Sequence, residues 1–104
     1  MNATKDSRKA KAKAAPQAPT HVVHIEYFDP QAKRVYIAGT FNEWHPQATE
    51  MVDLGHGRWA KELTLPAGEH EYRLVVDGAW KDDPHCPLTA PNPYGTHNAL
   101  LVLP

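Results

Sequence analysis

Two of the three tryptophans in this chain stand where an aromatic side chain can contact a ligand. Trp44 and Trp80 each lie in a polar, turn-rich segment directly after an expected strand end, and each is followed by residues that cannot form a packed strand face. Trp59 instead begins an alternating strand, in phase with Leu63, and large aromatic side chains are on average well buried. The sequence therefore predicts two exposed indole rings and one ring in the core or at its edge.

Two exposed indoles on a small acidic domain favour a ligand that offers apolar faces and little charge. A sugar ring fits, because its C–H face can lie on an indole while its hydroxyl groups reach polar side chains at the rim. If each indole buries about 100 Å² of surface, the hydrophobic gain is ~2.5 kcal/mol per ring, before association costs of at least a similar size. We therefore expect a dissociation constant on the order of micromolar to millimolar, useful on a polymer with many sites.

Short strands separated by glycine and proline turns must position these rings. The clearest strand covers residues 69–76, where period-two alternation puts Tyr72 on one face and Arg73 on the other. It runs into Asp77-Gly78, a strong hairpin signal just before Trp80. The other expected strands are residues 21–28, 34–38, 51–54, 58–65 and 98–103.

The pattern as a whole is typical of an all-β fold. Residues 40–46 are too polar to continue a strand, and we expect a loop that presents Trp44. Residues 83–94 contain four prolines, so this segment cannot be a central strand. Short strands at regular spacing, with no convincing helix and no internal repeat, predict a small antiparallel β-sandwich.

The first 20 residues differ in composition from the rest of the chain. They hold five basic residues, one acidic residue and no aromatic or β-branched apolar residue, which predicts a disordered basic tail. A single domain is expected over residues 21–104, which hold the other 6 of 11 basic and 11 of 12 acidic residues. An acidic domain argues against a nucleic-acid-binding surface on the folded part.

The sequence indicates neither export nor membrane insertion. The tail has no apolar core of signal-peptide length, and no stretch is apolar for long enough to span a bilayer. The single cysteine, Cys86, cannot form an internal disulfide, which fits a reducing compartment. We therefore expect a cytoplasmic protein with no membrane partner.

A metal site is not predicted. The seven histidines are scattered, and no zinc-ligand spacing is present. Only His85 and Cys86 are adjacent, and neighbours in sequence rarely chelate one ion. We expect no metal and no other cofactor.

Catalysis is not predicted either. A glycosidase-like carboxylate pair would have to come from Glu71, Asp77, Asp82 or Asp83. The hairpin turn explains Asp77 better, and a solvated acidic rim explains Asp82 and Asp83 better. Neither a Ser or Cys nucleophile motif nor a phosphate-binding glycine loop is present, so we expect a non-enzymatic protein.

Three separated motifs carry a resemblance to a known family. They are Val35-Tyr36-Ile37-Ala38-Gly39-Thr40-Phe41-Asn42-Glu43-Trp44, then residues 65–80 with Asp83-Pro84, then Asn92-Pro93-Tyr94-Gly95-Thr96-His97-Asn98. In order and spacing they resemble the glycogen-binding domain of AMP-activated protein kinase beta subunits and the related isoamylase-type early-set modules, carbohydrate-binding module family 48. The resemblance covers about residues 22–103. It implies an immunoglobulin-like (early-set) β-sandwich that binds α-1,4-linked glucan such as glycogen or starch.

The resemblance also assigns roles to individual residues. It implies that Trp44 and Trp80 are the stacking platforms for the sugar. It implies that Asn98 donates or accepts hydrogen bonds with sugar hydroxyl groups, and that Thr96 does so through its side chain or the adjacent backbone.

Two positions depart from the family pattern. Arg73 stands where the family has a lysine, so a planar fork replaces a point donor and its hydrogen bonds would be rearranged. Tyr94 stands where the family has a leucine that reaches through the ring of a cyclic glucan, and an aromatic ring there would either stack or block. The proline-dense segment 83–94 is expected to hold the site open without a ligand.

The alternative is a protein-interaction or scaffold module that binds no sugar, because exposed tryptophans are also favoured at protein interfaces. An interface would need a broader apolar patch, whereas a sugar site needs two rings and a polar rim. Trp44, Trp80 and Asn98 together fit the second description, so glucan binding is the favoured prediction. A protein partner for the module stays open beside it.

Overall fold

The computed structural model describes residues 19–104, so nearly all of the predicted basic tail lies outside the described residues. Within this range the chain forms eight strands and one turn of 3-10 helix. They are β2 (Thr20–Phe28), β3 (Val35–Gly39), η1 (Thr40–Asn42), β4 (Val52–Gly55), β5 (Arg58–Pro66), β6 (Gly68–Val76), β7 (Ala79–Lys81), β8 (Thr89–Pro91) and β9 (His97–Leu103). No helix in the described part of the chain is long and apolar enough to cross a membrane.

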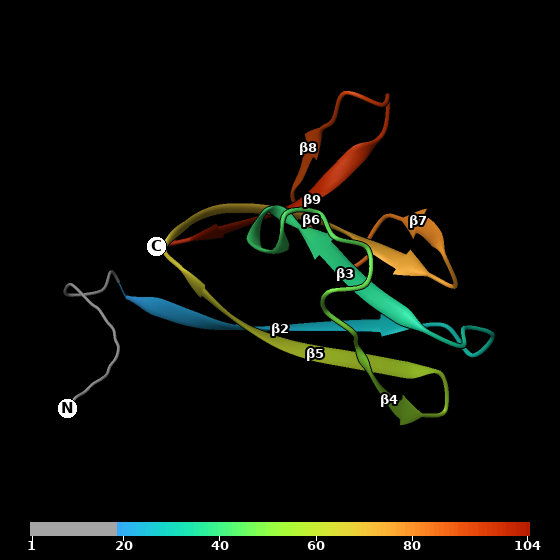
Figure 1. The fold of residues 1–104 in the computed structure, drawn as a ribbon. Helices are drawn as coiled ribbons and strands as arrows, with labels where there is room; N and C mark the ends of the chain where they lie inside the picture. The colour runs from blue at the N-terminus through green and yellow to red at the C-terminus, as the bar shows by residue number, and fades with distance from the viewer. Residues whose placement is uncertain (1–18) are drawn as a thin grey trace, which may run out of the picture.

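The strands form two antiparallel sheets that face each other, as Figure 1 shows. One sheet has three strands in the order β2-β5-β4. The other has five, in the order β3-β6-β9-β8 with β7 paired to β6. Only Ala67 separates β5 from β6, so the chain passes from one sheet to the other at this point. The predicted all-β antiparallel sandwich is confirmed.

The core fills the space between the two sheets. Alternation on β6 turns Tyr72, Leu74 and Val76 inward, where they are almost completely buried. Trp59 on β5 is 4% exposed and its Nε1 donates to the Asp29 carbonyl over 3.2 Å, so the predicted core position is confirmed. Other buried apolar side chains of this cluster are Ile25, Val35, Ile37, Met51, Leu63, Leu65 and Ala99.

Three short elements were not predicted. One is β7, which places Trp80 on a short strand paired with β6 and not in a turn. The loop after β3 contains one helical turn, because the Asn42 side chain folds back on the strand: its Nδ2 donates to the Ile37 carbonyl and its Oδ1 accepts from the Gly39 N–H. The proline-dense segment contains β8, which pairs only with β9 at the edge of the sheet. An edge position is where a strand tolerates proline, so the exclusion of a central strand was correct.

The structure contradicts the predicted solvated rim at Asp83. This carboxylate is 7% exposed; its Oδ2 accepts from the Tyr72 hydroxyl and its Oδ1 from the His85 N–H over 2.9 Å. Burial, followed by the bond to Asp83, raises the pKa of Tyr72 well above its usual range. Asp82 is exposed, as predicted. The prediction failed because β7 ends at Lys81, and beyond it the backbone leaves Asp82 in solvent but turns Asp83 toward Tyr72.

Candidate functional site

The outer face of the five-stranded sheet holds a cavity of ≈ 840 Å³. Its walls come from the loop after β3, from β6 and β7, and from the hairpin that joins β8 to β9. The residues that line it are Thr40, Trp44, Glu71, Arg73, Trp80, Asn92, Pro93, Tyr94, Thr96 and Asn98. All six site residues selected from the sequence, Trp44, Arg73, Trp80, Tyr94, Thr96 and Asn98, are therefore brought together in one cavity.

Trp80 reaches this cavity through a tight hairpin. Asp77 and Gly78 both have positive φ, 49° and 86°, as a two-residue turn between paired strands requires. Asp77 Oδ1 also accepts from the Lys33 and Arg34 N–H groups, both over 2.9 Å. These backbone bonds, that of Arg34 first, lower the pKa of the Asp77 carboxyl. The hairpin is thus tied to the β2–β3 connection, and Trp80 is presented with 44% of its surface exposed.

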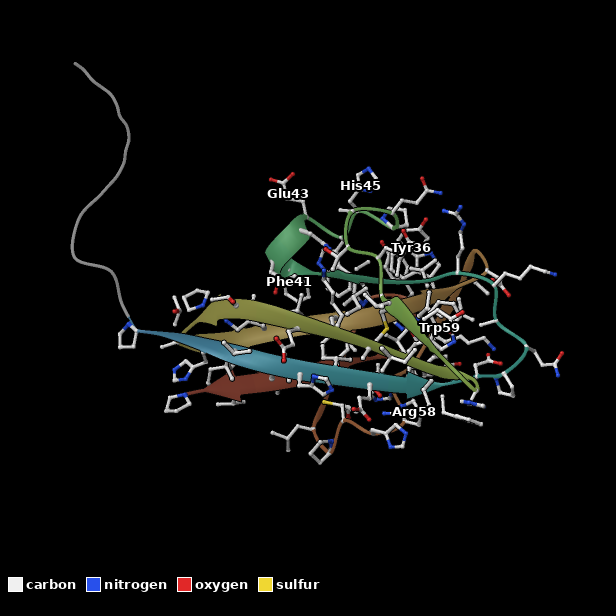
Figure 2. The ribbon with its side chains drawn as sticks, turned by 90° about the horizontal axis from the view of Figure 1, so that it is seen from below. Tyr36, Phe41, Glu43, His45, Arg58 and Trp59 are labelled. Carbon is white, nitrogen blue, oxygen red and sulfur yellow. The ribbon has the colours of Figure 1, made fainter. Side chains whose placement is uncertain are left out.

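Trp44 is held differently and is half-buried, so it is less exposed than the sequence predicted. Glu43 and Trp44 both adopt left-handed backbone conformations, with φ of 57° and 59°. Such conformations are costly for residues other than glycine and persist where neighbouring contacts impose them. The Trp44 N–H donates to the Gly39 carbonyl over 2.9 Å, which closes the loop. In Figure 2, Glu43 and His45 project away from the sheets on either side of this position.

Gly39 allows this loop to lie close against β6. A Cβ atom at this position would stand 2.4 Å from the Glu71 carbonyl oxygen and 2.8 Å from Tyr72 Cβ. Its φ of −163° is ordinary extended backbone, so the glycine is required for space. A larger residue would push the loop, and Trp44 with it, away from the cavity.

Arg73 connects two walls of the cavity. Its Nη2 pairs with Asp82 Oδ1 over 2.7 Å, just beyond β7, and its Nη1 donates to Thr96 Oγ1 over 3.3 Å, in the β8–β9 hairpin. The Arg73 side chain is only 15% exposed. The planar guanidinium therefore links two segments of the cavity wall through two different nitrogen atoms, and a lysine ammonium could not make both bonds with the same geometry.

Asn92 is the centre of the remaining polar network. Its Nδ2 donates to Thr96 Oγ1 over 2.8 Å and to Asn98 Oδ1 over 2.9 Å. Its Oδ1 accepts from the backbone N–H groups of Tyr94 and Thr96. Asn98 in turn donates from Nδ2 to Glu71 Oε1 over 3.0 Å. A continuous chain of hydrogen bonds thus runs from Asp82 across the floor of the cavity to Glu71.

Tyr94 is the outermost lining residue. It is 87% exposed at the tip of the β8–β9 hairpin, between Pro93 and Gly95, whose φ is 81°. Figure 1 shows this hairpin projecting away from the two sheets. Tyr94 therefore lies at the rim of the cavity.

Sequence reasoning assigned no binding role to four lining residues: Thr40, Glu71, Asn92 and Pro93. Two of them carried a usable signal. Asn92-Pro93 followed by Gly95 is a turn pattern in which the asparagine side chain caps its own backbone. Glu71 alternates with Arg73 and so lies on the same face of β6.

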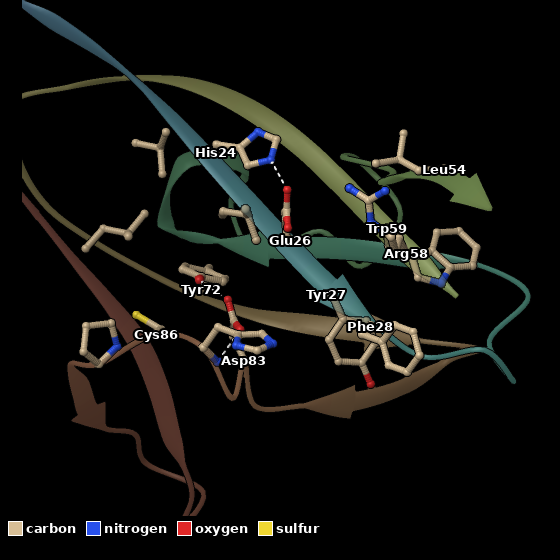
Figure 3. A pocket seen from close by; sticks show the side chains of 15 residues that line it. His24, Glu26, Tyr27, Phe28, Leu54, Arg58, Trp59, Tyr72, Asp83 and Cys86 are labelled. Atoms are coloured by element: carbon tan, nitrogen blue, oxygen red, sulfur yellow. Dashed lines mark hydrogen bonds and ion pairs between the residues drawn. The ribbon is translucent and has the colours of Figure 1, made fainter. Parts of the chain in front are cut away.

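A second cavity of ≈ 480 Å³ opens beside β2 (Figure 3) and shares no lining residue with the first. It contains the Tyr72–Asp83 pair, and at its border His24 Nε2 lies 2.7 Å from Glu26 Oε2. Among residues 19–104 no group of three or more histidine, cysteine or acidic side chains is arranged to hold a metal ion.

Comparison with known proteins points to one family. Residues 22–104 match the family model described as the glycogen recognition site of AMP-activated protein kinase. The 5'-AMP-activated protein kinase subunit beta-1 of Sus scrofa is 36% identical over 69 residues, which are 66% of this chain and 53% of that protein. The human subunits beta-1 and beta-2 are 36% and 38% identical over 69 residues each. The matched region spans about a quarter of the length of both human proteins, at 24%.

Proposed function

The chain belongs to the family of the glycogen recognition site of AMP-activated protein kinase, and on this premise we propose that residues 21–104 bind α-1,4-linked glucan without catalysis. The binding site is the cavity lined by Trp44 and Trp80. One observation carries the proposal: six residues selected from three separate sequence motifs line this single cavity. Two indoles beside a row of amide, hydroxyl and guanidinium groups match the two kinds of surface that a sugar presents.

The hydrogen-bond chain on the cavity floor supports binding by a preorganised site. Arg73, Asn92 and Asn98 are already held by protein partners, so fewer side chains lose freedom when a glucan arrives. Trp80 supplies exposed aromatic surface, and Tyr94 extends it at the rim. We therefore expect a weak single site, on the order of micromolar to millimolar, whose use depends on a polymer that offers many repeats.

Tryptophan fluorescence tests the proposal directly. Trp59 is buried between the sheets and provides a constant background, so a ligand-dependent change reports on Trp44 or Trp80. We expect a saturable change on titration with β-cyclodextrin and with maltoheptaose, and none with the β-linked control cellohexaose. No change with any of the three at millimolar concentration would overturn the proposal and favour the interaction module.

A role in bringing a protein partner to a glucan polymer follows from the same premise. The matched relatives are named as subunits of a kinase, and the region matched is a fraction of their length. We propose that this module tethers a partner in the cytoplasm, where the single Cys86 would stay reduced. Co-sedimentation of a partner with glycogen, lost in a Trp80→Ala variant, would support the tether.

A further inference from the structure

The charges around the cavity are unevenly compensated. Glu71 and Arg73 are the two charged side chains among the described residues that line it. The Arg73 guanidinium is already paired with the Asp82 carboxylate over 2.7 Å, and the arginine side chain is 15% exposed. Glu71 forms no ion pair within the described part of the chain, and Asn98 is the side chain that donates to it. The cavity therefore carries one uncompensated negative charge.

The hydrogen-bond chain also distinguishes Glu71 from Asn98. Asn98 is 7% exposed, and both ends of its amide are engaged: Oδ1 accepts from Asn92 and Nδ2 donates to Glu71. Glu71 is less buried and uses one carboxylate oxygen, Oε1, in this chain. A carboxylate has about four acceptor positions on its two oxygens, so Glu71 keeps acceptor capacity that Asn98 largely lacks.

We propose that Glu71 is the specificity-determining residue of the site and that it selects uncharged glucans over glucans that carry phosphate groups. This inference rests on the proposed function. The carboxylate accepts hydrogen bonds from sugar hydroxyl groups, and bonds to an ionised acceptor are roughly twice as strong as neutral ones. A phosphate group on the ligand would bring a charge of about −1.5 to −2 to a site where Asp82 already neutralises the nearest cation.

The test compares maltoheptaose with maltoheptaose that bears one phosphate at a C6 hydroxyl, using tryptophan fluorescence on the whole chain. We expect the wild type to bind the neutral sugar at least about 10-fold more tightly than the phosphorylated one. Glu71→Gln keeps the side-chain shape and one acceptor oxygen but removes the charge. We expect it to weaken maltoheptaose binding by about 10-fold, to strengthen binding of the phosphorylated sugar, and so to reduce or reverse the selectivity.

Glu69→Gln is the matched control. Glu69 lies on β6 two residues before Glu71, on the same face of the strand, and does not line the cavity. It removes the same charge, and we expect both affinities to stay within about two-fold of wild type, because the exposed position lies outside the cavity and is screened by salt. An equal selectivity change in this variant would show that overall charge, and not Glu71, sets the preference, and would overturn the inference.

The outcomes separate the two proposals. A wild type that binds neither sugar overturns the proposed function and this inference with it. A wild type that binds maltoheptaose, with a Glu71→Gln variant that binds both sugars more weakly by the same factor, overturns the inference alone, because a purely structural role changes affinity without changing selectivity.

Salt provides a second measurement on the unmutated chain: the preference for the neutral sugar should shrink as the salt concentration rises from about 20 mM to about 500 mM. A preference that does not respond to salt would also overturn the inference.

Discussion

The two cavities of this domain both have aromatic linings, but their rings are placed differently. Trp80 and Tyr94 stand on hairpins at the outer face of the five-stranded sheet, with much of their surface exposed. In the second cavity, Trp59 and Tyr72 are almost completely buried and belong to the core. The second cavity also has one exposed ring, that of Phe28, beside these structural side chains, whereas the first cavity has exposed rings on two separate hairpins. Substitutions of rings in the first cavity should change binding, and substitutions of the buried rings in the second should change stability.

The largest expected effect is on stability, from Tyr72→Phe. The variant keeps the ring in the core but leaves the buried Asp83 carboxylate without the hydroxyl donor. Loss of a partner by a buried charged group predicts destabilisation of about 3 kcal/mol in urea unfolding. The dissociation constant for maltoheptaose should stay within about two-fold of wild type, because Tyr72 faces away from the first cavity. A large loss of affinity with unchanged stability would contradict the comparison.

Urea unfolding of the wild type and of Tyr72→Phe across a range of pH provides a control for this prediction. The pKa of Tyr72 is raised chiefly by burial, so the folded state favours the neutral phenol. Its contribution to stability is complete below the unfolded pKa of about 10 and is lost as the pH rises above that value. The wild type should therefore lose stability in alkali by more than Tyr72→Phe does. A second variant, Tyr72→Phe with Asp83→Asn, should recover part of the lost stability, since an unpaired amide is less costly to bury than a carboxylate.

The next largest effect is on binding, from Trp80→Ala. Removal of ~2.5 kcal/mol of stacking predicts about 60-fold weaker binding of maltoheptaose and loss of retention on an amylose column. Stability should change by no more than about 1 kcal/mol, because 44% of the residue's surface is exposed and the ring lies outside the core between the sheets. Phe28→Ala is the matched control: it removes an exposed aromatic ring that lines the second cavity, and retention should be unchanged. Full retention of Trp80→Ala would exclude this ring as a platform.

A smaller effect is expected from Asn92→Ala. The variant removes the donor to Thr96 and Asn98 and the acceptor that caps the hairpin, while the stacking rings stay in place. Loss of about 1 kcal/mol of preorganisation predicts about five-fold weaker maltoheptaose binding in the fluorescence titration. Asn92→Asp keeps the capping oxygen, and its affinity for maltoheptaose should fall between that of the wild type and that of Asn92→Ala. Wild-type affinity in Asn92→Ala would mean that the network stabilises the hairpin without shaping the site.

Local sequence patterns predicted the parts of this structure that local physics decides. Alternation of β-branched and aromatic residues located the long strands, and the Asp77-Gly78 pair located the hairpin that presents Trp80. Burial of Trp59 followed from its phase on β5. The residues proposed to bind glucan were selected by resemblance of three motifs to a family, and alternation alone would have grouped only those on β6.

Other features depend on contacts between distant segments, which no local pattern encodes. Asp83 is buried because the segment after β7 folds over Tyr72, eleven residues earlier in the chain. The half-buried position of Trp44 has a local cause that the sequence also does not show: two successive non-glycine residues with positive φ close its loop onto Gly39, five residues earlier. The network around Asn92 is joined to β6 by two long-range hydrogen bonds, from Arg73 to Thr96 and from Asn98 to Glu71. These features all concern side-chain direction at strand ends, where period-two alternation no longer applies.

The smallest expected effect is a loss of stability in acid that depends on Asp77, in the hairpin that carries Trp80. Hydrogen bonds from the Arg34 and Lys33 N–H groups lower the pKa of Asp77 in the folded state. The stability that this carboxylate contributes is present above its unfolded pKa of about 3.9 and is lost as the pH falls below that value. Asp77→Asn tolerates the same left-handed backbone and keeps an acceptor for these bonds, so the variant should be slightly less stable than wild type near neutral pH. In thermal unfolding the gap between the two proteins should narrow as the pH falls below about 3.9, and it should close once the pH has passed the lowered pKa of the folded state. High pH should therefore lower stability through Tyr72, beside the second cavity, whereas low pH should lower it through Asp77, in the hairpin that carries Trp80. A stability difference that stays constant with pH would show that the charge of Asp77 does not strengthen its hydrogen bonds to the β2–β3 connection.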